Sequence, residues 1–74
     1  MNRKFLEQHL QLAERHIAQS ERHIRHQREL LERLAAEGQD TTEAEYLLRE
    51  FEHGLALHAA DRNRTLVELD KPAR

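Results

Sequence analysis

The sequence predicts an all-α protein: two helices that form an antiparallel hairpin, which pairs with a second copy into a four-helix bundle. Three observations predict this. Apolar side chains recur at helical spacing along most of the 74 residues. The composition favours helix, because Leu, Ala, Glu, Arg and Gln dominate while Gly occurs twice and Pro once. A single break around Gly38 divides the periodic stretch in two.

The first helix is predicted from a seven-residue repeat. From residue 7 the sequence reads EQHLQLA, ERHIAQS, ERHIRHQ and RELLERL. The fourth place of the successive units holds Leu10, Ile17, Ile24 and Leu31. The seventh place holds Ala13, Ser20, Gln27 and Leu34, and Leu6, just before the first unit, continues this second series. Such a stripe is typical of a helix packed along a seam. We predict a helix over residues 3–37.

The break is predicted from turn and capping residues. Gly38 can adopt the left-handed conformation that ends a helix, and a run of three N-cap residues, Asp40, Thr41 and Thr42, comes shortly after it. Two pairs match the capping-box motif: Thr42 with Glu45, and Asp40 with Glu43. Pro72 marks a stop after the last apolar positions. The sequence therefore predicts a turn over 38–41, a second helix over 42–70 and a single hairpin domain over 1–74.

The short connection predicts how the two helices face each other. A link of about four residues makes consecutive helices antiparallel neighbours. Folding about residues 39 and 40 pairs Leu31 with Leu48, Ile24 with Leu55, Ile17 with Arg62, and Leu10 with Leu69. The apolar faces are wider than one seam, so we expect a second copy to cover the surplus. The expected interface residues are Leu6, Leu10, Leu12, Ile17, Ile24, Leu30, Leu31, Leu34, Leu47, Leu48, Phe51, Leu55, Leu66 and Leu69.

A polar layer is expected in the middle of this seam. It comprises Ser20, Gln27, His58 and Arg62, with His58 placed opposite Ser20 and Glu21. Buried polar layers of this kind fix the register and the oligomeric state of helical bundles. Ser20, His58 and Asp61 are the residue types of a hydrolase triad. A serine on a regular helix, however, has neither a strained turn nor an oxyanion hole, so we predict no catalytic residue and no enzyme.

The six histidines allow a second interpretation. His9, His16 and His23 share one heptad place, and about 10.5 Å of helix separates neighbours, too far for one metal ion. We interpret this column as a half-buried border of the seam; a pH-sensitive seam is the alternative. His23 and His26, one turn apart, are weak candidates for binding a transition metal. A histidine-dependent metal-binding or pH-sensing regulatory protein is therefore the alternative function, and no cofactor is expected.

Charge and composition narrow the range of partners. The formal charge of −2 creates no single-sign field that would attract nucleic acid or anionic membrane. Cysteine is absent, which excludes disulfides and thiolate zinc sites. Residues 1–20 lack the apolar core of a signal peptide, and no apolar run approaches the roughly 20 residues that span a bilayer. We expect a cytoplasmic, non-enzymatic interaction or scaffold protein that binds itself, and through itself another protein.

Three segments carry a resemblance to known sequences. They are AERHIAQSERHIRHQRELLERL (residues 13–34), GQDTTEAEYLLREFE (38–52) and LALHAADRNRTLVEL (55–69). Together they resemble a group of short, uncharacterised proteobacterial helical-hairpin proteins, over nearly the whole chain. The resemblance implies a hairpin fold and a bacterial cytoplasmic setting. It implies no activity, cofactor or site residue.

Overall fold

The first helix, α1, spans Arg3–Ala36 and is closed at both ends by local hydrogen bonds. The Asn2 side chain accepts a hydrogen bond from the Lys4 N–H at 2.8 Å, which caps the N-terminus. At the other end Gly38 adopts a left-handed conformation with φ of 71°. The N–H groups of Gly38 and Gln39 then donate to the carbonyls of Ala35 and Leu34 at 3.1 and 2.9 Å, the pattern of a Schellman motif.

The second helix, α2, spans Thr42–Asp70, the predicted bounds, but its N-terminus is capped differently from the prediction. The Asp40 carboxylate accepts hydrogen bonds from the Thr42 N–H at 3.0 Å and from the Thr42 hydroxyl at 2.7 Å. These two bonds hold the pKa of Asp40 below its usual value. Thr42 is already the first residue of the helix, and the Glu45 N–H donates to the Thr41 carbonyl at 2.9 Å, so the predicted capping box of Thr42 with Glu45 does not form.

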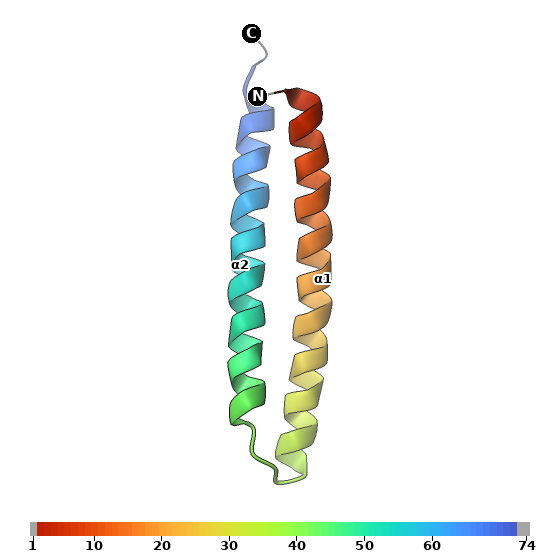
Figure 1. Ribbon diagram of the computed structural model, residues 1–74, viewed down its shortest axis with the longest axis vertical. Coiled ribbons are helices and arrows are strands. Elements are labelled where there is room, and N and C mark those ends of the chain that lie inside the picture. Colours follow the sequence, from red (N-terminus) through yellow and green to blue (C-terminus); the bar gives the residue numbers. More distant parts are fainter. Residues whose placement is uncertain (1, 73–74) are drawn as a thin grey trace.

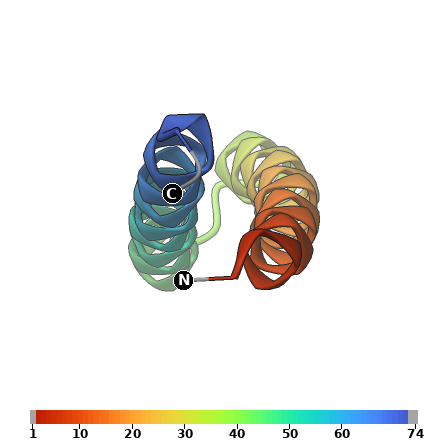
Figure 2. The same ribbon diagram turned by 90° about the horizontal axis from the view of Figure 1, so that it is seen from above.

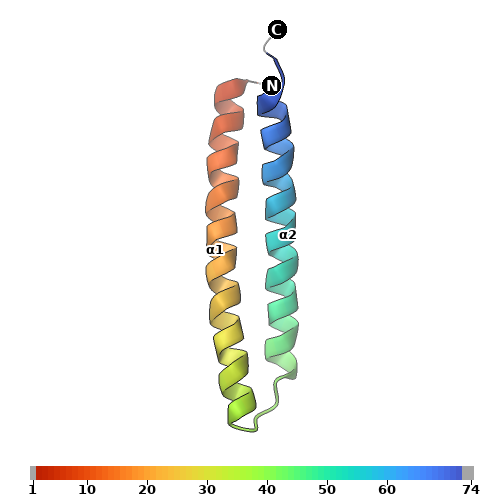
Figure 3. The ribbon, with the colours of Figure 1, turned by 180° about the vertical axis from the view of Figure 1, so that it is seen from behind.

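The computed structural model describes residues 2–72, which form an antiparallel hairpin (Figure 1). The predicted all-helical hairpin is confirmed, and within these residues no strand is present. The start of α1 and the end of α2 lie together at one end of the rod, as the view from behind also shows (Figure 3). Seen from the end, the two helices are inclined to each other (Figure 2), as expected for helices that pack along a heptad seam.

The register of the hairpin differs from the predicted one by about one turn. We expected His58 opposite Ser20 and Glu21, yet its ring lies against His16, and Phe51 lies against His23. The reason is the shape of the connection. Residues after Gly38 do not form a symmetric bend but run back beside the last turn of α1, so α2 starts above the end of α1 (Figures 1 and 3).

The core is a single seam between the helices. Six described residues are buried: Leu6, Ala13, Ile24 and Gln27 of α1, and Ala44 and Thr65 of α2. No large side chain within residues 2–72 is fully buried. The Cα positions extend over 61 × 14 × 13 Å with a radius of gyration of 17.0 Å, whereas a compact domain of this length has about 11 Å. The hairpin is therefore a thin rod with an incomplete core.

Candidate functional site

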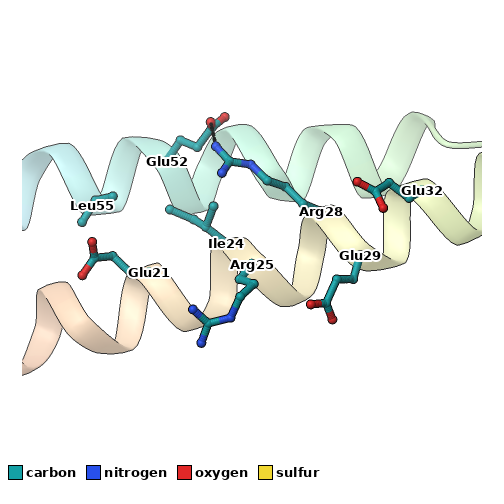
Figure 4. A pocket seen from close by; sticks show the side chains of 8 residues that line it. All are labelled: Glu21, Ile24, Arg25, Arg28, Glu29, Glu32, Glu52 and Leu55. Carbon is teal, nitrogen blue, oxygen red and sulfur yellow. Dashed lines mark hydrogen bonds and ion pairs between the residues drawn. The ribbon is translucent and has the colours of Figure 1, made fainter.

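One side of the seam is an aliphatic surface, which we call the aliphatic face. It comprises Leu10, Ile17, Ile24 and Leu31 of α1 with Leu48, Leu55 and Leu69 of α2, and Leu66 lies at its border. All but Ile24 and Leu66 are half-buried, and Leu66 is 44% exposed. Figure 4 shows Ile24 and Leu55 between the helices at the floor of an open groove of about 580 Å³.

Charged side chains border this groove. Arg28 of α1 donates to Glu52 of α2 at 3.3 Å (Figure 4), and Glu21 and Arg25 lie along the same groove. Both side chains of the Arg28–Glu52 pair are about half exposed, at 60% and 46%, so solvent screens the pair and its contribution to stability is small. The aliphatic face thus has an apolar floor with a charged rim.

The opposite side of the seam, which we call the histidine edge, carries the predicted histidine column. Each of its members contacts a different residue of α2. His9 Nε2 lies 2.9 Å from Oδ2 and 3.1 Å from Oδ1 of Asp61. The ring centroids of His16 and His58 are 4.8 Å apart, and those of His23 and Phe51 are 5.6 Å apart.

The pair of His9 and Asp61 was not anticipated from the sequence. The hydrogen bond from His9 is the main cause that holds the pKa of Asp61 below its usual value, and the charges of His9, Arg64 and His58 act in the same direction. The only signal in the sequence was that His9 and Asp61 each lie beside the apolar seam of their own helix. Because the aspartate lies one turn from His58, the pairing depends on the register of the hairpin, which the sequence did not fix.

The buried polar groups of the seam are satisfied. Gln27 Nε2 donates to the Ala44 carbonyl at 3.0 Å, and the Thr65 hydroxyl donates to the Asp61 carbonyl at 2.9 Å. Within residues 2–72 no buried side-chain nitrogen or oxygen lacks a partner. Thr65, His9 and Asp61 line one small groove of about 260 Å³, but the Thr65 hydroxyl proton is spent within its own helix. The contacts are those of a structural seam.

The structure does not gather the expected polar layer at one level. Gln27 meets Ala44 near the connection, whereas His58 meets His16, and 14 residues of α2, or about 21 Å, separate these two contacts. Arg62 donates to Asn63 on its own helix at 3.3 Å, and Ser20 is half-buried. The polar side chains are spread along the seam because the register is displaced.

The expected interface residues divide by exposure. Leu6 and Ile24 are buried within the hairpin, while Leu12, Leu47 and Leu66 remain 43%, 38% and 44% exposed. The remaining expected residues are half-buried: Leu10, Ile17, Leu30, Leu31, Leu34, Leu48, Phe51, Leu55 and Leu69. Further large apolar side chains are exposed outside this set, namely Phe5, Tyr46, Leu57 and Val67. The hairpin alone therefore shelters only part of its apolar surface.

The weak metal candidates, His23 and His26, are both exposed. They line a shallow groove with Gln27 and Phe51, and the His23 ring packs on Phe51. In the part of the chain that the structure describes, no group of three or more His, Asp or Glu side chains is arranged to hold a metal ion. His23 and His26 thus have no additional metal-binding side chain from α2 beside them in the described residues.

Comparisons with protein-family models, curated proteins and solved structures give no match. Neither helix between residues 2 and 72 combines the length and apolarity that crossing a bilayer requires. The bacterial relatives and the cytoplasmic setting expected from the sequence stay predictions.

Proposed function

We propose that the chain is a non-enzymatic interaction protein that associates with itself, two hairpins packing through their aliphatic faces into a four-helix bundle. The observation that supports this most directly is the accessible surface of 5917 Å². A compact monomer of 8.8 kDa exposes about 4,800 Å². The hairpin therefore exposes roughly 1,100 Å² more than a compact protein of its mass, and a standard interface covers about 800 Å² on each partner.

The arrangement of side chains supports the aliphatic face as the surface that is covered. Leu10, Ile17 and Leu31 share one heptad place along α1, with the buried Ile24 between the last two. Leu48, Leu55 and Leu69 line α2 at multiples of the same seven-residue spacing. These residues border the seam and are already half-buried, so a second hairpin would complete their burial and extend one continuous core. A continuous aliphatic strip flanked by charges is the pattern of helical bundle interfaces.

The rim gives the interface selectivity. The first place of the heptad, next to the aliphatic face, holds Glu7, Glu14, Glu21 and Arg28, and α2 contributes Glu45 and Glu52. Charges at such flanking positions set the choice and the orientation of partners more than they set affinity. This acidic border disfavours indiscriminate association with other apolar surfaces. In this proposal the bundle acts by presenting its outer faces to another protein and performs no reaction.

Two leucines of α2 provide a matched test. Leu66 shares the heptad place of Glu52, on the aliphatic side, and Leu57 lies nine residues earlier, which at 100° per residue is the opposite side of the helix. Both are exposed, at 44% and 58%, so replacing either by lysine leaves the lone hairpin almost unperturbed. We expect Leu66→Lys to raise the dimer dissociation constant at least about tenfold, since a charge would be buried.

The measurement is sedimentation equilibrium of both variants and the unmodified chain over the same concentration range. Leu57→Lys should dissociate like the unmodified chain. Equal dissociation constants for Leu66→Lys and the unmodified chain would contradict the proposed face. If only Leu57→Lys weakens the dimer, the interface lies on the side of α2 that carries Leu57.

A further inference from the structure

The contact between His16 and His58 joins the two helices at the histidine edge. The two rings come from α1 and α2, both side chains are half-buried, and their centroids lie 4.8 Å apart with ring planes inclined by 50°. This is the one place in residues 2–72 where two aromatic rings of the imidazole type meet in the structure. It is on the opposite side of the seam from the aliphatic face.

The nitrogens of these two rings are available to a ligand. Within residues 2–72 neither ring forms a hydrogen bond with the protein, although both residues lie beside the seam. No side-chain nitrogen in that range is buried without a partner, so the nitrogens of both rings reach water. His9 differs, because its Nε2 is engaged by the Asp61 carboxylate.

The separation of the rings suits a shared metal ion. A zinc–nitrogen bond is about 2.0–2.1 Å, so two imidazoles bound to one tetrahedral ion have their centroids about 5 Å apart. The observed 4.8 Å matches this without a change in the spacing of the helices. The nearest carboxylate along α2 is Asp61, one turn after His58, but it is held by His9 and by Arg64 at 3.6 Å.

We propose that His16 and His58 together bind a divalent late transition-metal cation such as Zn²⁺, which bridges α1 and α2. Imidazole nitrogen selects ions of this class over Mg²⁺ or Ca²⁺. Since no third metal-binding side chain converges on the pair in the described residues, water completes the coordination and the site is open. The proposal goes beyond self-association and stands whether or not two hairpins pair.

Such an ion would stabilise the folded hairpin. The two ligands are 42 residues apart in sequence and meet only when the hairpin forms, so an ion that bridges them binds the folded chain in preference to the unfolded one. The expected effect is a rise in Tm of about 4–8 °C when free Zn²⁺ is about five times its dissociation constant, at fixed protein concentration, with a further rise as Zn²⁺ increases.

The test has two parts, both on the untagged chain. The first is a zinc titration monitored by calorimetry, and the second is a set of thermal melts with and without chelator. We expect one ion per chain, a Tm that rises with Zn²⁺ and no response to Mg²⁺. His16→Asn and His58→Asn should each abolish the rise in Tm. His53 is an exposed histidine of α2, so His53→Asn should retain the rise. Metal-free melts of each variant establish first that it folds.

Two results would overturn the site. The first is a zinc response that survives in both His16→Asn and His58→Asn, or one that disappears in a variant with asparagine at both His23 and His26. The second comes from the imidazole NMR signals of the unmodified chain, which do not depend on any variant folding. The signals of His16 and His58 should shift together on the first equivalent of Zn²⁺, and a shift confined to the other rings would contradict the proposal.

Discussion

At the scale of single residues, polar contacts reinforce the register that the connection sets. A seam built on a seven-residue repeat packs almost equally well when one helix slides by seven residues. Two contacts remove that degeneracy: Gln27 reaches the Ala44 carbonyl at 3.0 Å, and His9 reaches the Asp61 carboxylate at 2.9 Å. A slide by one heptad would leave the buried Gln27 amide without its partner, at a cost of about 1–3 kcal/mol.

The pKa of Asp61 provides a direct readout of this register. The hydrogen bond from His9 lowers it from the ordinary value of 3.8, so we expect a carboxyl ¹³C titration midpoint below that value. His9→Ala should return the midpoint toward 3.8. Because the folded pKa is depressed, the stabilisation is present above the unfolded pKa and is lost as the pH falls through the folded pKa. An unchanged midpoint in His9→Ala would show that the two side chains do not meet in solution.

At the scale of elements, the two glycines have opposite roles. Gly38 ends α1 with a φ of 71°, whereas Gly54 lies within α2 and a Cβ there would have no atom within 4 Å. Gly38→Ala should lower the free energy of unfolding by about 1–2 kcal/mol, because the left-handed conformation strains an L-residue. Gly54→Ala should raise it by about 0.5–1 kcal/mol through helix propensity.

Chemical denaturation of the two variants checks this pair, since both substitutions add the same methyl group. A loss of stability in Gly54→Ala as large as that in Gly38→Ala would mean that a neighbouring helix approaches α2 at residue 54. That outcome would place a partner against the face of α2 that carries Gly54. A neutral Gly38→Ala would mean that the connection does not require its left-handed residue.

The elements themselves could be predicted from the sequence, because their signals are local. The heptad repeat and Gly38 gave α1 to within one residue at its C-terminus, and the apolar spacing gave α2. The choice of capping residue and the register could not be predicted. Asp40, Thr41 and Thr42 are all good N-cap types, and the path of the connection sets how far α2 is displaced along α1. That displacement decided that His58 would meet His16 and that Asp61 would meet His9.

At the scale of the whole molecule, one seam does not make a closed core. The hairpin is a rod 61 Å long with only six described residues buried, and two packed helices of this length leave one face of each uncovered. Small chains without disulfides gain stability from a metal ion or from assembly. We propose a surface for each: the aliphatic face for a second copy, and the histidine edge for a cation.

The central claim is that the hairpin pairs with itself, and the mass of the untagged chain in metal-free buffer at neutral pH tests it most directly. Size-exclusion chromatography with light scattering should give twice the chain mass of 8.8 kDa at high concentration, and a mass that falls toward one chain on dilution. A folded particle with the mass of a single chain at every accessible concentration would contradict the account.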